Sequence, residues 1–263
     1  MKSGFIFDVD GVLVDTPHEQ AWRESFQNLF ETKPHWKKLL QNANYAPEKF
    51  STDLYRTQIS GKTRYEGAQA VLDYFSVPDP DGTLLDEYCR AKQQLVLTKI
   101  ETGDFKVFDD ALLFLMNAKA RGAKLVAASS SKNATPLLEK INILRFAETN
   151  KLDFPFLNRS TTLLSLFDGN VCGIDLEKGK PEPEIFMKAA ESIRLSPAQC
   201  LVVEDAVSGV QAAINGGFFC IGIARLNDEK ELRDAGAHIV TDDLRTVFSS
   251  VFECRWNQYL ERN

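Results

Sequence analysis

Three short apolar segments, each followed at once by polar residues, limit most strongly what this chain can fold into. Residues 4–7, 123–128 and 200–203 are apolar runs of the kind that form strands buried on both faces of a parallel sheet. Helical patterns at 111–121 and 183–193 separate them. This alternation predicts an α/β fold built on a doubly wound, mostly parallel, Rossmann-like sheet.

The polar residues that end these segments are expected to meet at one site. Ligands of doubly wound sheets bind in a crevice beyond the carboxyl ends of the strands. The polar clusters are Asp8-Val9-Asp10, Ser129-Ser130-Ser131 and Glu204-Asp205. Because each cluster follows a predicted strand, the sequence predicts that all three converge on a single crevice.

Residues 17–103 differ from the rest of the chain because they are rich in helix formers and lack β-branched runs. Amphipathic helical patterns recur there in three places, at 19–30, 65–74 and 84–100. We therefore expect an α-helical cap domain at 17–103, inserted after the first strand as a lid over the crevice. The α/β core would comprise residues 1–16 and 104–263, and its sheet should resume around residues 105–111.

A second unusual stretch, at residues 144–163, shows little periodicity and contains Phe154-Pro155-Phe156. It follows a predicted helix and precedes a predicted strand, so it should lie at the edge of the sheet opposite the crevice. We expect a role in packing or in oligomer contacts rather than in catalysis.

Composition excludes several classes of protein. The 263 residues are 44% hydrophobic and carry a net charge of −6, so the chain can bury a large core but repels nucleic acid and anionic membranes. No apolar run approaches the roughly 20 residues of a membrane span. The five cysteines form no C-x-x-C pair, which favours free thiols over a zinc site. With no signal-peptide pattern at the start, we expect a cytoplasmic protein.

The pair Asp8 and Asp10, with Gly11 permitting a turn after them, is suited to phosphoryl transfer. One carboxylate can attack phosphorus as a nucleophile, while the second moves the proton of the leaving or entering oxygen. A divalent cation is then needed to offset the charge of the substrate. Glu204 and Asp205 offer the hard oxygen ligands that Mg2+ prefers, although one of them could instead cap the helix predicted at 209–215.

Ser129 and Lys180 are the candidates for binding a phosphoryl group. The Ser129 hydroxyl and the neighbouring backbone N–H groups could hold phosphoryl oxygens. Alternatively, residues 129–131 could cap a helix that starts near Asn133, a role compatible with anion binding. Lys180 stands between Gly179 and Pro181 and would supply positive charge to the aspartate and the phosphate.

In their order and spacing, these elements resemble the haloacid dehalogenase superfamily. The matching motifs are D-x-D-G-V-x-x-D-T at 8–16, the serine-ended second strand, G-K-P-x-P-x-I-F at 179–186 and V-V-E-D-x-x-x-G-V-x-A at 202–212. The resemblance implies a nucleophile, a general acid/base, two phosphate contacts and a magnesium site; these are, in turn, Asp8, Asp10, Ser129 with Lys180, and Asp205 with Glu204. It also implies metal bonds from Asp8 and from the Asp10 carbonyl. Dehalogenases of the superfamily lack the second aspartate, so Asp10 indicates phosphoryl chemistry.

Within the superfamily, the sequence is most similar to the β-phosphoglucomutase branch. The branch has an S-K-N element that meets the far end of the substrate, a lid arginine that grips the phosphate not transferred, a hinge histidine and a lid lysine. The matching residues are Ser131-Lys132-Asn133, Arg64 within 61–64, His18 four residues before Trp22, and Lys92. Two features depart from the branch: the linker between Thr16 and His18 is shorter, and residues 144–163 are extra. Arg64 could instead form a lid salt bridge, and His18 could be a surface residue at a helix start.

The expected activity is Mg2+-dependent phosphoryl transfer on a sugar phosphate through an aspartyl-phosphate, converting β-glucose 1-phosphate to glucose 6-phosphate. A phosphatase that hydrolyses small sugar phosphates is the alternative, because lid closure decides whether water completes the reaction. A phospho-receiver signalling domain is a distant third; such domains are much shorter and have no lid. A monomer or weak homodimer is expected, and the sugar and its anomer stay open.

Overall fold

The chain divides into two compact units in the computed structural model, which describes residues 3–39, 43–60, 62–248 and 251. The α/β unit comprises Met1–Asp15 and Lys106–Asn263, and the helical unit comprises Thr16–Phe105. The junctions lie between Asp15 and Thr16 and between Phe105 and Lys106. Description of the helical unit as a cap stays a prediction. Gly61 of the expected lid loop and Cys254 lie outside the described residues.

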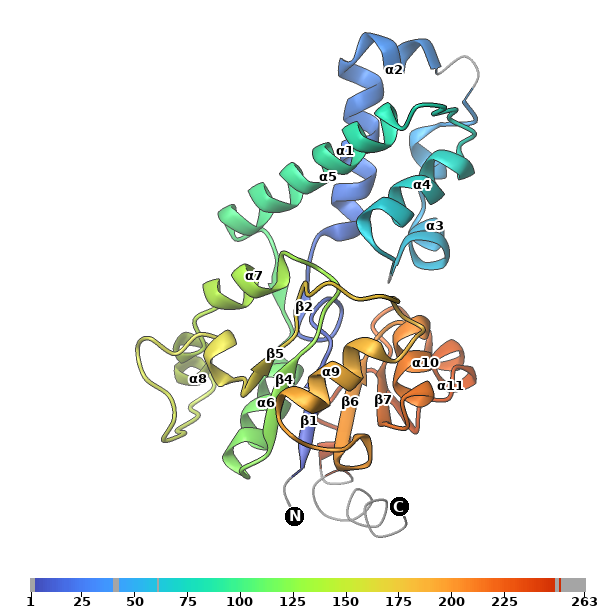
Figure 1. Cartoon of the computed structure of the whole chain (residues 1–263). Helices are drawn as coiled ribbons and strands as arrows, with labels where there is room; N and C mark the ends of the chain where they lie inside the picture. Colours follow the sequence, from blue (N-terminus) through green and yellow to red (C-terminus); the bar gives the residue numbers. More distant parts are fainter. Residues whose placement is uncertain (1–2, 40–42, 61, 249–250, 252–263) are drawn as a thin grey trace. The chain divides into compact units, whose positions relative to one another are not determined.

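A six-stranded parallel sheet forms the centre of the α/β unit (Figure 1). The strand order is β5-β4-β1-β6-β7-β8, and every neighbouring pair is parallel. Their bounds are β1 Gly4–Phe7, β4 Lys124–Ala127, β5 Gly169–Asn170, β6 Cys200–Glu204, β7 Phe219–Ile223 and β8 Ile239–Thr241. The three strands expected from apolar runs are β4, β1 and β6, which are adjacent, so the predicted α/β fold is confirmed.

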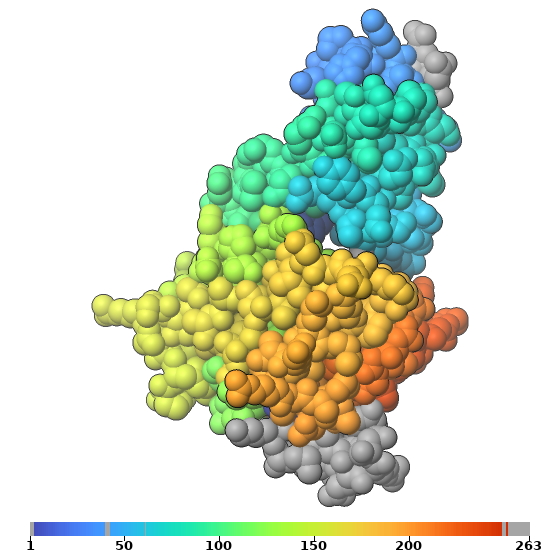
Figure 2. Space-filling model, viewed as in Figure 1, coloured from blue at the N-terminus to red at the C-terminus, as the bar shows by residue number. Residues whose placement is uncertain are grey.

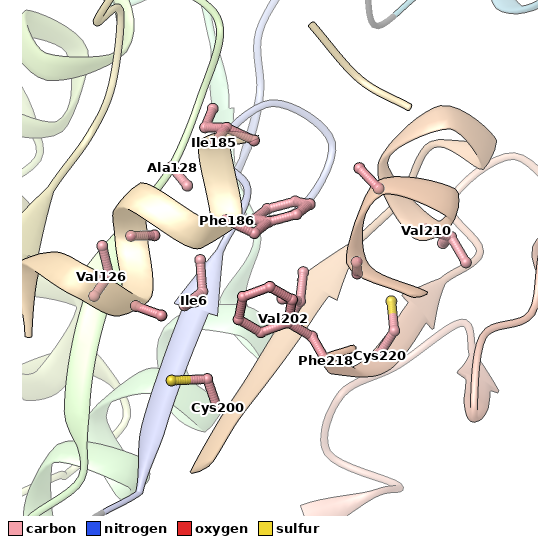
Figure 3. Close-up of a cluster of buried hydrophobic side chains, with 14 of the residues drawn as sticks. Ile6, Val126, Ala128, Ile185, Phe186, Cys200, Val202, Val210, Phe218 and Cys220 are labelled. Carbon is pink, nitrogen blue, oxygen red and sulfur yellow. The ribbon is translucent and has the colours of Figure 1, made fainter. Parts of the chain in front are cut away.

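Helices cover both faces of this sheet because alternate residues of the strands point to opposite sides. On one face, Ile6 of β1 and Val202 of β6 pack against Phe186 of α9 and Val210 of α10 (Figure 3). On the other face, the rings of Phe5 and Phe7 contact Phe114 of α6. The helices of the unit are α6 Asp109–Ala120, α7 Ala134–Lys140, α8 Leu144–Thr149, α9 Glu184–Ser192, α10 Val207–Asn215 and α11 Glu229–Asp234, with short 3-10 turns η3 Leu164–Leu166 and η4 Pro197–Gln199.

The expectation that the sheet resumes around residues 105–111 is wrong. Strand β3, Lys106–Val107, pairs antiparallel with β2, Val14–Asp15, in a separate two-stranded sheet. The physical reason is the turn after β1, which reverses the direction of the chain. Strand β2 follows this turn and pairs with residues 106–107, where the chain re-enters the α/β unit. The main sheet resumes at β4.

The extra segment 144–163 lies between α7 and β5, at the surface of the α/β unit (yellow-green in Figure 2). It contains α8 and a bridge between Asn142 and Thr162. The chain then continues through η3 into β5. The rings of Phe154 and Phe156 are stacked on each other, 5.2 Å apart. A role of this segment in oligomer contacts stays a prediction.

The helical unit is held together by an aromatic core. Phe26 of α1 is fully buried and its ring contacts those of Trp36, Phe75 and Tyr88. The Tyr88 hydroxyl donates to the Trp22 carbonyl at 2.9 Å, so this polar group is satisfied inside the core. The elements are α1 His18–Thr32, α2 Pro34–Leu39, η1 Pro47–Lys49, α3 Thr52–Leu54, the π-turn η2 Tyr55–Ile59, α4 Arg64–Tyr74 and α5 Thr83–Thr102.

Two expectations from composition can be compared with the described residues. Cys89, Cys172, Cys200 and Cys220 are free thiols, and all but Cys172 are buried. In the part of the chain that the structure describes, no helix has the length and apolar character needed to cross a bilayer.

Candidate active site

Backbone hydrogen bonds carry the strand pairing of β4, β1 and β6 past the ends of the strands. The Asp8 N–H donates to the Val203 carbonyl at 3.0 Å, and the Ala128 N–H donates to the Phe7 carbonyl at 2.9 Å. These bonds align the residues that directly follow the three strands with one another. As a result, Asp8, Ser129 and Glu204 emerge at the same edge of the sheet, as the sequence predicts for parallel strands.

A buried ion pair network lies at the centre of this edge. The Lys180 ammonium group donates to Asp8 Oδ1 at 2.6 Å and to Glu204 Oε1, and its side chain is 6% exposed. The second oxygen of Glu204 accepts from the Ala206 N–H at 2.7 Å. The ring of Phe186 lies 5.2 Å from the ammonium group. Both oxygens of Glu204 are therefore engaged, and this carboxylate anchors Lys180 beside Asp8.

Gly11 lets Asp205 approach the turn that follows Asp10. Its φ of +80° is a left-handed conformation that favours glycine. A Cβ atom at this position would lie 1.9 Å from Asp205 Oδ2, so the carboxylate occupies the space that any side chain would need. The Gly11 N–H donates to the Val14 carbonyl at 2.8 Å and closes the turn. The absence of a side chain thus brings the fourth acidic residue to the site.

The electrostatics of the site are dominated by crowded carboxylates. Burial raises the pKa of Asp8 to about 7; the charges of Glu204 and Asp10 add to the rise, and Lys180 opposes it. Burial, reinforced by the charges of Glu204 and Asp8, also raises the pKa of Asp205 well above its usual range. Burial alone would lower the pKa of Lys180, but the two carboxylates outweigh it and raise that pKa. Lys180 therefore stays charged, and the site favours further positive charge.

The loop after β4 carries the other candidate residues of the α/β unit. Ser129 is buried, and its hydroxyl accepts from the Ser131 N–H at 3.0 Å. The Ser131 hydroxyl accepts from the Asn133 N–H at 3.2 Å, and Lys132 pairs with Asp175 at 3.1 Å. Helix α7 starts at Ala134 with no side-chain cap, so residues 129–131 form turns rather than cap a helix.

Neither residue of the acidic pair is the N-cap of helix α10. The helix starts at Val207 and its N-cap is Ala206, whose backbone N–H donates to Glu204. Among the described residues, no group of three or more His, Cys, Asp or Glu side chains is arranged to hold a metal ion. The expected metal residues Asp8, Asp10, Glu204 and Asp205 do not form such a group of side chains; the bond expected from Asp10 is from its carbonyl oxygen, and Lys180 binds Asp8 and Glu204.

Three candidates lie in the helical unit. His18 is the first residue of α1, and its Nδ1 lies 3.3 Å from the ammonium nitrogen of Lys92 on α5. Lys92 is 6% exposed and also lies 4.9 Å from the centre of the Trp22 ring. Because an ammonium group has no lone pair, His18 Nδ1 must be the acceptor, which places the proton of a neutral ring on Nε2. His18 is thus held by Lys92 rather than left as a simple surface residue.

Arg64 is the first residue of α4 and lies within the capping box that Thr63 and Glu66 form. Within the described residues, no carboxylate lies within salt-bridge distance of Arg64, so the lid salt bridge considered for it is not found.

The comparison with known families decides the assignment. A family model described as haloacid dehalogenase-like hydrolase matches residues 2–217. The chain belongs to this family. It is therefore an enzyme of the haloacid dehalogenase superfamily, and the phospho-receiver alternative is no longer needed.

The proteins similar to this chain include both mutases and phosphatases. The chain is 29% identical over 258 residues to the β-phosphoglucomutase of Mycobacterium bovis, covering 91% of this chain and 88% of the relative. It is 30% identical over 238 residues to a phosphorylated carbohydrates phosphatase of Thermotoga maritima, covering 88% and 90%. The solved β-phosphoglucomutase of Pyrococcus sp. strain ST 04 superposes with a TM-score of 0.64 at 27% identity, covering 94% of this chain and 98% of that one.

Cys172 is a residue of the site that the sequence motifs do not reveal. Cys172 follows β5 at the same edge of the sheet, and burial together with the charges of Asp8 and Asp10 raises its pKa to about 12. A raised pKa keeps a thiol protonated, which does not favour a role as nucleophile. The sequence gives little sign of this position, because β5 has only two residues and lacks an apolar run. Nothing in it therefore indicates that its end lies beside the ends of β4, β1 and β6.

We predict that Gly11→Ala damages the site far more than a matched substitution, Gly122→Ala. Both glycines have φ near +80°, but a Cβ at Gly122 would meet nothing within 4 Å. Each variant should lose about 1–2 kcal/mol of stability, because alanine disfavours the left-handed backbone conformation. Displacement of Asp205 should lower p-nitrophenyl phosphate hydrolysis about a hundredfold in Gly11→Ala alone. Equal activities of the two variants would contradict this account of the turn.

Proposed function

We propose that the protein transfers the phosphoryl group of a sugar phosphate through a covalent phosphate on Asp8, with Mg2+ as cofactor. The observation that carries the proposal is the buried contact of Lys180 with Asp8 and Glu204 at the carboxyl edge of β1 and β6. Lys180 holds one oxygen of Asp8 and leaves the other for attack. A phosphoryl group bound there would meet a fixed positive charge as negative charge develops.

In the first half-reaction, the oxygen of Asp8 that Lys180 does not hold attacks phosphorus. The bond between phosphorus and the sugar oxygen breaks, and Asp10 gives its proton to that oxygen as it leaves. Ser129 and Lys180 bind the phosphoryl oxygens. The products of this step are the free sugar hydroxyl and phosphorylated Asp8.

In the second half-reaction, a hydroxyl group attacks the phosphate on Asp8. Asp10, now a carboxylate, takes the proton of this hydroxyl, and the bond between Asp8 and phosphorus breaks. A mutase uses a hydroxyl of the sugar itself, whereas a phosphatase uses water. The difference lies in whether water is excluded while the intermediate exists.

The residues at the site fit Mg2+. Mg2+ is usually bound by one or two carboxylates and retains several waters. Asp8 and Asp205 would supply the carboxylates and Asp10 its carbonyl oxygen, while Glu204 remains bound to Lys180. The raised pKa values of Asp8 and Asp205 support this choice, because a nearby dication stabilises crowded carboxylates in their charged form. The bound ion would offset the negative charge that the phosphate brings to these acids.

The sugar would be bound by residues outside the reacting centre. In the α/β unit these are Ser131, Lys132 and Asn133, on the loop after β4. In the helical unit they are His18, Lys92 and Arg64. We propose that Arg64 binds the phosphate that is not transferred, which agrees with the lack of a carboxylate partner for Arg64 within the described residues.

We favour a β-phosphoglucomutase-like reaction, from β-glucose 1-phosphate to glucose 6-phosphate. The mutases of M. bovis and Pyrococcus, each aligned over nearly the whole chain, support it. The phosphatase of T. maritima, at 30% identity, supports hydrolysis of small sugar phosphates as the second candidate. The free thiols are in keeping with the expected cytoplasmic location.

One assay tests the function directly. Purified protein is given β-glucose 1-phosphate with trace glucose 1,6-bisphosphate, and both glucose 6-phosphate and free phosphate are followed. We predict Mg2+-dependent formation of glucose 6-phosphate with little free phosphate. Release of phosphate without isomerisation would select the phosphatase, and activity that survives exhaustive EDTA treatment would reject the role of Mg2+.

We predict that Arg64→Ala selectively weakens reaction with a bisphosphate. Loss of a charge-assisted contact to the second phosphate should cost about 1.5–3 kcal/mol, or roughly ten- to a hundredfold in kcat/KM for glucose 1,6-bisphosphate. The rate with p-nitrophenyl phosphate, which has no second phosphate, should hardly change. Arg90→Ala, at an exposed position on α5, is the control. A ratio of the two kcat/KM values that stays unchanged would refute this role of Arg64.

A further inference from the structure

Arg225, which follows β7, contacts the turn that carries Asp10 although no motif marks it. Its Nε donates to the Gly11 carbonyl at 3.3 Å, and its Nη2 donates to the Val12 carbonyl at 3.4 Å. The two carbonyls belong to the residues directly after Asp10. The guanidinium group thus holds the backbone of the turn without touching the Asp10 carboxylate.

The guanidinium group is itself held by several further contacts. It forms a bidentate pair with Asp110 of α6, with both N···O distances at 3.0 Å, and it donates to the Asp242 carbonyl at 3.3 Å. Its carbon lies 3.9 Å from the centre of the Phe108 ring. With the bonds to Gly11 and Val12, all five N–H groups of Arg225 are used.

Asp110 is in turn fixed by the backbone. Its Oδ2 accepts from the Leu244 N–H at 2.9 Å, and its side chain is 8% exposed. The Phe108 N–H donates to the Leu13 carbonyl at 3.0 Å. Three consecutive carbonyls of the turn, from Gly11 to Leu13, are therefore held by Arg225 and by the segment on which Arg225 rests.

The turn is also in close contact with Asp205. The Asp205 carboxylate occupies the space beside the Gly11 Cα, while Arg225 holds the Gly11 carbonyl. A short backbone segment whose carbonyls are hydrogen-bonded and whose Cα is in close contact with a carboxylate has little freedom to rotate. Asp10, which directly precedes Gly11, inherits this restriction.

We infer that Arg225, together with Asp110, is a positioning pair that sets the location of the acid/base carboxylate Asp10. This inference rests on the proposed function, in which Asp10 protonates the leaving oxygen. Transfer of a proton requires hydrogen-bond distance, and misplacement by about 1 Å can cost about a hundredfold in rate. A purely structural pair would affect all substrates equally, whereas a positioning pair affects those that need the proton.

Arg225→Lys and Asp110→Asn test the inference with two substrates. Glucose 1,6-bisphosphate loses a sugar alkoxide, which needs a proton from Asp10, whereas p-nitrophenyl phosphate loses a stable phenolate that does not. We expect kcat/KM for the bisphosphate to fall about ten- to a hundredfold in both variants, with much less loss for p-nitrophenyl phosphate. Because the second half-reaction also needs Asp10, phosphorylated enzyme should accumulate during turnover of p-nitrophenyl phosphate.

The controls separate the possible failures. Arg245→Lys changes an exposed arginine that pairs with its neighbour Asp243, and it should leave both rates unchanged. Asp10→Asn calibrates the assay, since it removes the proton itself and should show the same selectivity more strongly. Arg225→Lys keeps the charge and Asp110→Asn keeps the shape, so the second variant is used if the first does not fold.

An equal loss for both substrates, or no loss for the bisphosphate, would overturn the positioning role while leaving the proposed function intact. If Asp10→Asn itself shows no selectivity, the proposed function fails and the inference fails with it.

Discussion

One buried ammonium group organises the candidate active site of this enzyme. Lys180 contacts the buried carboxylates of Asp8 and Glu204, and its positive charge also opposes the rise in the pKa of Asp205 that burial and these neighbours cause. Removing one partner from a buried ion pair costs about 3–5 kcal/mol, because the remaining charge has no compensation. Lys180 thus links the strand that carries Asp8 to the strand that carries Glu204 and also prepares the site for an anionic phosphoryl group.

Two glycines make this crowding possible. At Gly11, a Cβ would lie 1.9 Å from Asp205, and at Gly209, in α10, a Cβ would lie 1.7 Å from Glu204 Oε1. In each case a carboxylate takes the place of a side chain. The acidic residues therefore reach the carboxyl edge of the sheet from two directions, one beside the turn after β1 and one beneath the first turns of α10.

The sequence was most informative where a residue's own neighbours determine its structure. Strands β1, β4 and β6 are buried on both faces, so their apolar runs predicted them within about one residue at each end, which is the usual uncertainty of such boundaries. Strand β5 has only two residues and was not predicted. Strands β7 and β8 were not predicted either, because none of the polar clusters of the candidate site follows them. The expected return of the sheet at residues 105–111 failed because β3 found its partner in β2, a pairing between distant segments that no local pattern reveals.

The same limit applies to the site. Asp8, Ser129, Lys180 and Glu204 follow from motifs, and the structure brings them to one edge of the sheet. The contact of Arg225 with the turn after Asp10 joins residues more than 200 positions apart, so spacing could not predict it. Similarly, the turns formed by residues 129–131 looked like a helix cap, since a serine before a helix can serve either purpose.

The central claim is that Asp8 carries the phosphate during turnover, and a direct chemical measurement can test it. The enzyme is mixed with glucose 1,6-bisphosphate and Mg2+, quenched in acid within the first turnover, digested, and analysed by mass spectrometry. The account predicts one phosphoryl group on the peptide containing Asp8 in the wild type, and neither phosphate nor turnover in a folded Asp8→Asn variant. A phosphate on a different residue, or turnover by Asp8→Asn at the wild-type rate, would contradict it.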